Sequence, residues 1–255
     1  MLASLPSHLL IIGATLACAF AMNTTSAQNM IHSEATAVKI APVHHSALVL
    51  EWNGVTVYVD PHDGAYRFKQ YAAPDLILIT DIHGDHFDAK TLQEFDLSKA
   101  QIIAPQAVMD LLPEALQKIT SVLANGASIE KNSIGIEAIP MYNMPDPNDP
   151  RHPKGRGNGY VLTMGGERIY ISGDTEDIPE MRALKNIDIA FVCMNLPYTM
   201  TVDQAASGVL AFQPKVVYPC HYRGPEGLSD VERFKELVNT GDPKIEVRLV
   251  DWYKE

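Results

Sequence analysis

The most informative stretch of the sequence is Ile79-Thr80-Asp81-Ile82-His83-Gly84-Asp85-His86-Phe87-Asp88. It follows an apolar run over 76–79, which is typical of a buried parallel strand. Within six positions it carries four side chains of the kinds that bind metals, namely Asp81, His83, Asp85 and His86. Open α/β sheets place their chemistry in the loops that follow such strands. The sequence therefore predicts a strand, a ligand loop, and a helix that begins only after His86.

Imidazole and carboxylate groups together suit zinc, manganese or iron. Two metal ions a few ångströms apart would need about this many ligands from one loop, with others from elsewhere in the chain. The alternative is a solvated acidic loop with two incidental histidines. Further ligand types occur at later strand ends and in a later loop, which favours the metal site.

The loop resembles the His-x-His-x-Asp-His signature of the metallo-β-lactamase superfamily, with Asp81 where the first histidine usually stands. The segment 169–175 is similar to the strand and Gly-Asp turn that supplies the bridging aspartate, here Asp174. The segment 216–221 is similar to the strand that ends in the last histidine, here His221. The resemblance covers nearly all of the chain after residue 27. It implies a four-layer αβ/βα sandwich, an α/β fold in which helices flank two packed sheets.

The resemblance also implies the ligand set. One metal would be held by Asp81, His83 and a later histidine, and the other by the Asp85-His86 pair and His221, with Asp174 bridging. The later histidine is absent from its commonest place, and His152 is the only histidine in the following loop. A similar Tyr-Asn followed by His-Pro-Lys occurs in the ascorbate-phosphate lactonase-like branch. We therefore expect His152 as the ligand, the alternative being a surface histidine.

The cofactor expected from this set is one or two divalent metal ions, zinc first, with manganese or iron as alternatives. An anionic ligand at Asp81 favours the harder ions relative to zinc, and leaves a single-metal enzyme open. If Asp81 and His83 lie two residues apart in extended chain, they point to the same side, so Asp81 takes the place of the histidine.

The chemistry that such a site supports is hydrolysis by a metal-bound hydroxide, because bound metals lower the pKa of water towards ~7 and polarise the substrate. Asp85 is the expected catalytic residue, which would orient the nucleophile or carry its proton. Lys154, Arg223 and Tyr198 are the expected substrate-binding residues, and Arg151 and Arg156 are further basic groups near the mouth. The alternative for each basic residue is a solvated loop charge.

The chain has 255 residues and 46% apolar composition, enough for one large α/β domain. An apolar run over 9–22, followed by Thr25-Ser26-Ala27, predicts a signal peptide at 1–27 and a hydrolase domain at 28–255. No Lys or Arg precedes the run, so a retained membrane anchor is the alternative. We expect a periplasmic or secreted protein with no stable membrane association after cleavage.

The formal net charge of -11 lies entirely after residue 27, which argues against nucleic acid as a partner. The expected partner is a small-molecule substrate, and homo-oligomers are left open. Cys193 and Cys220 would be plain apolar residues of buried strands, with a disulfide between them as the alternative.

The rest of the chain predicts alternating strands and helices. Asn53-Gly54 and Gly165-Gly166 predict tight hairpin turns. Strands are expected over 38–41, 46–52, 55–60, 128–130, 135–140, 160–164, 168–172, 187–193, 215–218 and 245–250, and helices over 89–94, 106–118, 178–184, 202–212 and 230–238, the last capped by Ser229. Residues 141–158 are expected to form a loop that walls the site. Asp60 and the pair His44-His45 are expected near the metals as partners of the ligands, or as ordinary turn residues.

Three functions fit the sequence. The first is a metal-dependent hydrolase of a small ester, lactone or phosphodiester. The second is β-lactam hydrolysis, with which Asp81 and Asn143 agree poorly. The third is a non-catalytic metal-binding protein in which Asp81 marks a degenerate site.

Overall fold

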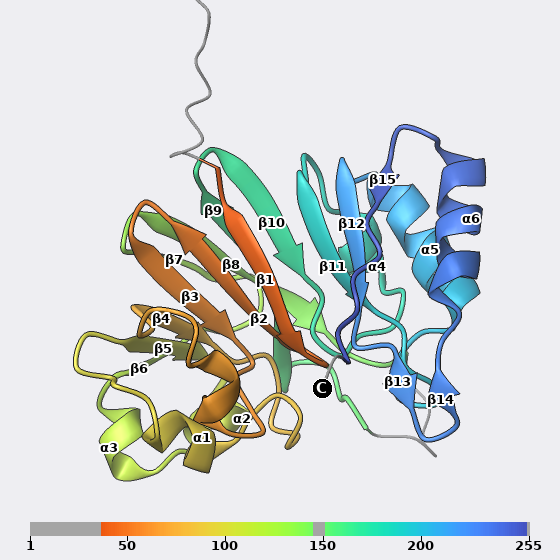
Figure 1. Ribbon diagram of the computed structural model, residues 1–255. Helices are drawn as coiled ribbons and strands as arrows, with labels where there is room; N and C mark the ends of the chain where they lie inside the picture. Colours follow the sequence, from red (N-terminus) through yellow and green to blue (C-terminus); the bar gives the residue numbers. More distant parts are fainter. Residues whose placement is uncertain (1–36, 145–150, 254–255) are drawn as a thin grey trace, which may run out of the picture. The chain divides into compact units, whose positions relative to one another are not determined.

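The computed structural model describes residues 37–144 and 151–253, so the predicted signal segment 1–27 lies outside it. Within these ranges, one mixed sheet has six strands in the order β1-β2-β3-β4-β5-β6 (Figure 1). Its strands are β1 Lys39–His44, β2 Ala47–Trp52, β3 Val55–Val59, β4 Leu76–Leu78, β5 Gln101–Ala104 and β6 Thr120–Val122. The first three are antiparallel and the last three run parallel to β3.

A second mixed sheet has seven strands in the described ranges, in the order β15-β12-β11-β10-β9-β8-β7. They are β7 Ser128–Lys131, β8 Ile134–Met141, β9 Gly157–Met164, β10 Glu167–Ile171, β11 Ile189–Cys193, β12 Val216–Cys220 and β15 Glu246–Val247. The chain again begins with antiparallel hairpins and continues with parallel strands from β10 onward. A short ribbon pairs β13 Arg223–Gly224 with β14 Gly227–Leu228.

Alternate residues of the central strands face two different cores. Leu76 and Leu78 belong to a cluster that includes residues of both sheets, so this cluster fills the space between them. Ile77 and Ile79 belong to a second cluster with residues of the helices α1 to α3. A strand buried on both faces has to be apolar throughout, which is why 76–79 has no polar residue.

Helices cover the outer faces of both sheets. Figure 1 shows α1–α3 beside β4–β6, and α5 and α6 beside β12 and β15. The helices are α1 Ala89–Gln93, α2 Gln106–Met109, α3 Glu114–Gln117, α4 Pro179–Arg182, α5 Val202–Phe212 and α6 Val231–Gly241, with a 3-10 turn at Ala65–Phe68. Two sheets between two helical layers confirm the predicted αβ/βα sandwich. Among the described residues, no helix combines the length and hydrophobicity that spanning a bilayer requires.

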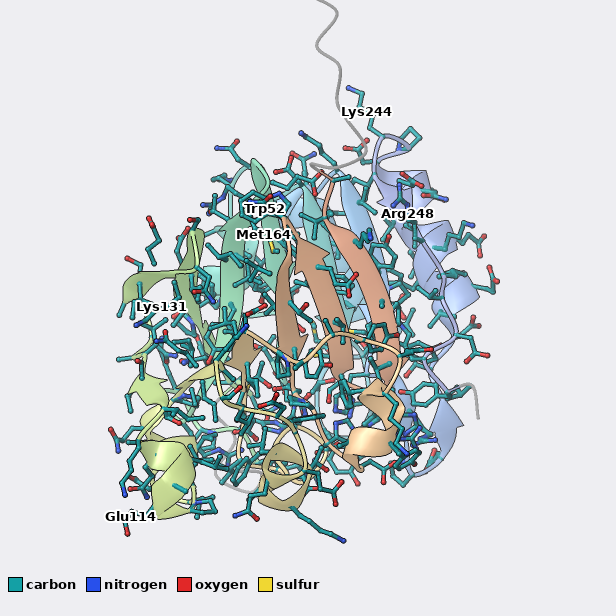
Figure 2. All side chains as sticks on the ribbon, turned by 60° about the vertical axis from the view of Figure 1, so that its left-hand side comes forward. Trp52, Glu114, Lys131, Met164, Lys244 and Arg248 are labelled. Carbon is teal, nitrogen blue, oxygen red and sulfur yellow. The ribbon has the colours of Figure 1, made fainter. Side chains whose placement is uncertain are left out.

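Both predicted hairpin turns are confirmed. Trp52 pairs with Val55 and Met164 with Glu167, which leaves two residues in each turn, all with positive φ. Trp52 and Met164 lie at the same end of the two sheets, far from Glu114 of α3 (Figure 2). The hairpin turns therefore occupy one end of the sandwich.

Several predicted boundaries are wrong for identifiable reasons. The helix expected over 106–118 is two helices, because Pro113 lies just before α3 and ends the first one. Asp230, not Ser229, caps α6, and its side chain accepts a hydrogen bond from the Arg233 N–H. The strands β5 and β6 were not predicted, since three or four residues are too short for a clear periodicity. Cys193 and Cys220 pair in register on neighbouring strands, and both are buried free cysteines.

The loop expected over 141–158 ends early, since β9 begins at Gly157. At this point the two sheets approach closely, and the Asn158 N–H donates to the Thr80 carbonyl over 2.9 Å. A Cβ atom on Gly157 would lie 2.9 Å from that same carbonyl oxygen. Glycine at this position thus brings the ligand loop after β4 against the second sheet.

We predict that Gly157→Ala lowers the free energy of unfolding by about 1–3 kcal/mol, because the added methyl group pushes against a backbone atom. Gly135→Ala in β8 is the matched control, since its Cβ would meet Thr163 at an ordinary 3.4 Å. Denaturant unfolding of both variants measures the difference. Equal stabilities would contradict the account of this close approach.

Candidate metal centre

The predicted ligands come together at one end of the sandwich from four separate segments. Asp174 and His221 follow β10 and β12 of the second sheet. His152 lies between β8 and β9. The remaining four, Asp81, His83, Asp85 and His86, follow β4 of the first sheet. All seven side chains fall into clusters of close ligand atoms, although they span 141 residue positions of the chain, from 81 to 221.

The buried cluster consists of His86, His221 and Asp174. The Nε2 atoms of the two histidines are 3.1 Å apart. Asp174 Oδ1 lies 3.3 Å from the first and 3.4 Å from the second. Asp85 approaches from the cavity side, with Oδ2 3.3 Å from His221 Nε2.

The Asp81 cluster consists of Asp81, His83 and His152. Asp81 Oδ2 lies 2.9 Å from His83 Nδ1, so the two side chains point to the same side as predicted. His152 Nε2 lies 3.3 Å from His83 Nδ1 and 3.3 Å from Asp174 Oδ2. Asp174 thus presents one oxygen to each cluster.

These spacings fit a metal ion in each cluster. Ligands about 2.0–2.1 Å from a tetrahedral ion lie roughly 3.3 Å from one another, close to most of the distances above. Asp174 Oδ1 is buried and makes no hydrogen bond within the described part of the chain. A buried carboxylate oxygen without a partner is costly, and a cation between the histidines would supply one. The His/Asp clusters therefore form a metal-binding site, and Asp174 lies between the two clusters.

The pKa shifts in the buried cluster also indicate a site that favours positive charge. Burial acts to raise the pKa of Asp174, but His221 and His86 outweigh it and hold that pKa well below its usual value. Burial acts to lower the pKa of His86, and Asp174 and Asp60 outweigh it and raise that pKa well above its usual value. A proton on His86 and a metal ion would satisfy the same negative potential.

Outer partners orient the two most buried ligand histidines. His86 Nδ1 donates to Asp60 Oδ2 over 2.8 Å, and Thr80 donates to both oxygens of the same carboxylate. His152 Nδ1 donates to Asn143 Oδ1 over 2.7 Å. Each contact leaves Nε2 facing the cluster, the arrangement by which proteins aim ligand histidines. The placement of Asp60 near the metals was predicted, whereas the role of Asn143 was not.

Arg156 contacts Asp81 and does not line the cavity mouth. Its Nε and Nη2 lie 3.1 Å and 2.9 Å from the two oxygens of Asp81. Asp81 is fully buried, and hydrogen bonds from His83 and Arg156 hold its pKa below the usual value against the opposing effect of burial. The pair of charges is neutral overall, like the histidine that the superfamily signature has at this position.

The clusters open into a cavity of about 460 Å³. Tyr198 and Arg223, two of the predicted substrate-binding residues, line it, and so does Arg151. Lys154 is not part of the lining, because its ammonium group pairs with Glu180 at 2.6 Å. The lining is formed by His45, His83, Asp85, Arg151, His152, Asp174, Asn195, Tyr198, Arg223, Gly224 and Pro225.

We predict that Asp81→Ala loses the metal ion bound with His83 and His152 and keeps the ion bound with His86 and His221. The reason is that only the Asp81 cluster loses a ligand atom. Metal analysis after dialysis against zinc measures the change, with the exposed Asp110→Ala as the control for lost charge. If Asp81→Ala binds as much zinc as the parent with equal affinity, the carboxylate is not a ligand.

We predict that Arg156→Met destabilises the metal-free protein by about 3–5 kcal/mol, because it leaves the Asp81 carboxylate buried without its cation. Zinc should then restore more stability to the variant than to the parent. Arg168→Met is the control, since Arg168 pairs with the half-exposed Glu137 and should cost less than about 1 kcal/mol. Thermal unfolding with and without zinc measures both effects, and equal gains from zinc would contradict the pairing.

The comparisons with known proteins agree with this site. Residues 39–221 match the family model of the beta-lactamase superfamily domain. A UPF0173 metal-dependent hydrolase from Thermococcus onnurineus is 33% identical over 211 residues, covering 79% of this chain and 92% of that protein. A UPF0173 metal-dependent hydrolase from Pyrococcus abyssi is 28% identical over 212 residues. This match also covers 79% of this chain and 92% of that protein.

Solved structures support the same assignment. A candidate metal-dependent hydrolase from Parabacteroides distasonis is 41% identical, with a TM-score of 0.74, and the match covers 83% of this chain and 92% of that one. Igni18, a metallo hydrolase from Ignicoccus hospitalis, shares the fold at 23% identity and a TM-score of 0.69. The match covers 84% of this chain and 95% of that one. The likeness to the ascorbate-phosphate lactonase-like branch stays a prediction, because these matches identify the superfamily and the UPF0173 family. The chain belongs to the UPF0173 metal-dependent hydrolases of the metallo-β-lactamase superfamily.

Proposed function

We propose that this metal-dependent hydrolase cleaves a small ester, lactone or phosphodiester that carries a negative charge. The observation that supports this most strongly is the cavity, which is lined by residues of two His/Asp clusters and by two arginines. A volume of about 460 Å³ is within the usual range for small-molecule sites.

The residues divide the work of hydrolysis among them. When bound, divalent metal ions lower the pKa of water and polarise the carbonyl or phosphoryl oxygen that is attacked. The four ligand histidines, Asp81 and Asp174 would hold them, with zinc as the first candidate. Asp85 is half-exposed at the cavity, and hydrogen bonds from His221 and His45 keep its pKa low although burial acts to raise it. Its carboxylate would therefore be ionised and able to orient the attacking water as a hydrogen-bond acceptor.

Arg151 and Arg223 supply the proposed charge recognition. Both line the cavity, Arg151 above the ring of Tyr198 at 5.1 Å and Arg223 above the ring of Tyr253 at 4.5 Å. Stacking on an aromatic ring helps to hold each guanidinium in place, and Arg151 also donates from Nη1 to the Pro197 carbonyl over 2.6 Å. Guanidinium groups are the side chains best suited to recognise a carboxylate or phosphate. In a protein with a net charge of -11, two arginines in one cavity favour an anionic substrate.

The test is a panel of hydrolysis assays on the zinc-loaded full chain, with bis(p-nitrophenyl) phosphate, p-nitrophenyl acetate, a neutral and a carboxylated γ-lactone, and a chromogenic cephalosporin. We expect turnover of an anionic ester, lactone or phosphodiester, and loss of it with a chelator and recovery with zinc. Faster turnover of the cephalosporin would favour β-lactam hydrolysis instead. Stoichiometric metal without any turnover would favour a binding protein.

Arg223→Ala and Lys154→Ala form a matched pair for the charge recognition. Removing a charged hydrogen bond costs about 1.5–3 kcal/mol, so Arg223→Ala should raise KM for the anionic substrate roughly 10- to 100-fold. The KM for its neutral counterpart should stay the same. Lys154→Ala should change neither, because Lys154 lies outside the cavity lining. A larger effect of Lys154→Ala would contradict the proposed mode of binding.

A further inference from the structure

His45 lies in the site although it belongs to none of the ligand segments. It occupies the turn between β1 and β2, lines the cavity, and its ring centroid lies 3.8 Å from that of His221. Its Nε2 atom is 3.3 Å from Asp85 Oδ2. Its backbone has a positive φ of 53°, a conformation that is uncommon for a residue with a side chain and is concentrated at functional sites.

The other nitrogen of His45 contacts the C-terminal segment. His45 Nδ1 lies 2.8 Å from the hydroxyl oxygen of Tyr253, a residue 208 positions away in the sequence. The backbone is tied at the same place, since the His45 N–H donates to the Trp252 carbonyl and the His221 N–H donates to the His45 carbonyl. Trp252 is buried, so this end of the chain is anchored in the core.

The direction of the hydrogen bonds that join Tyr253, His45 and Asp85 follows from which of these groups can donate a hydrogen. The backbone N–H of Tyr222 donates to the hydroxyl oxygen of Tyr253 over 3.0 Å, so this oxygen already accepts one hydrogen bond. An ionised Asp85 carboxylate can only accept, so the hydrogen between Asp85 and His45 lies on His45 Nε2. In a neutral ring this leaves His45 Nδ1 as the acceptor, and the Tyr253 hydroxyl donates to it. A neutral imidazole that accepts at Nδ1 carries its hydrogen on Nε2, and that hydrogen points at Asp85.

We propose that Tyr253 and His45 are positioning residues that hold the Asp85 carboxylate in place through a directed chain of hydrogen bonds. Tyr253 sets which nitrogen of His45 carries the hydrogen, and His45 donates that hydrogen to Asp85 Oδ2. This inference rests on the proposed function only for the part that Asp85 takes in hydrolysis. The chain of hydrogen bonds can be tested without a substrate.

The competing role for His45 is that of a metal ligand, because its ligand atom also lies close to those of Asp85 and His221. A nitrogen that carries a hydrogen has no lone pair to give to a metal. The hydrogen-bonding role requires a hydrogen on Nε2, whereas the metal-binding role requires a lone pair there. The tautomer of His45 therefore distinguishes the two roles.

The experiment is long-range ¹H–¹⁵N correlation NMR on the ¹⁵N-labelled, zinc-loaded full chain, which reports the tautomer of each histidine. His45→Gln assigns the signals of His45. We expect the Nε2–H tautomer in the parent and a shift towards a mixture in Tyr253→Phe, which loses only the hydroxyl group. Tyr222→Phe is the matched control, since its hydroxyl binds the Val250 carbonyl of the same segment without touching His45. It should leave the His45 signals unchanged.

Metal content and kinetics complete the test. Tyr253→Phe and His45→Gln should keep the parent's zinc content. They should lower kcat on bis(p-nitrophenyl) phosphate by roughly tenfold or more, with KM nearly unchanged. An Nδ1–H tautomer in the parent, His45 signals that ignore Tyr253→Phe, or loss of zinc in His45→Gln would each overturn the proposal. If the phosphodiester is not cleaved at all, the proposed function fails, and the tautomer still decides the chain of hydrogen bonds.

Discussion

The buried carboxylate of Asp174 is the group on which the site depends. Moving a carboxylate out of water costs several kcal/mol unless positive charge and hydrogen bonds replace the water. Here the replacement comes from the Nε2 atoms of His86, His221 and His152, each within 3.4 Å of one of its oxygens. Without a metal ion, the raised pKa of His86 favours a proton on that ring, which supplies one positive charge beside Asp174. Metal ions would supply positive charge in place of that proton, with the histidines as neutral ligands. The two oxygens of Asp174 face different clusters, so each oxygen could meet its own cation.

Two sheets are needed to make this arrangement. The ligand loop after β4 comes from one sheet, and Asp174 and His221 come from the strand ends of the other. The shared core of Leu76, Leu78 and their partners holds the two sets in register. Among the described residues near the clusters, His45, Asp60 and His221 all have positive φ, which costs of order 1–3 kcal/mol each. The packing of the core between the sheets offsets this strain. The strained backbone places the side chains of these three residues at the clusters.

Much of the fold and of the ligand set could be predicted from the sequence, because both depend on residues that lie close together along the chain. The run over 76–79 and the ligands directly after it need no distant information, and Asn53-Gly54 determines its own turn. The contacts of Lys154 and Arg156 could not be predicted in this way. The two residues lie close together in an irregular loop, yet Lys154 pairs with Glu180 and Arg156 with Asp81. No periodicity sets the direction of side chains there. The contact between His45 and Tyr253 depends on the closed fold and has no sequence signal.

The most direct test of the shared site is anomalous X-ray diffraction at the zinc edge from crystals grown with saturating zinc. The account predicts two peaks, one among Asp81, His83 and His152 and the other between His86 and His221. Each should lie within bonding distance of a different oxygen of Asp174. A single peak, or peaks that leave Asp174 without a metal neighbour, would contradict the account.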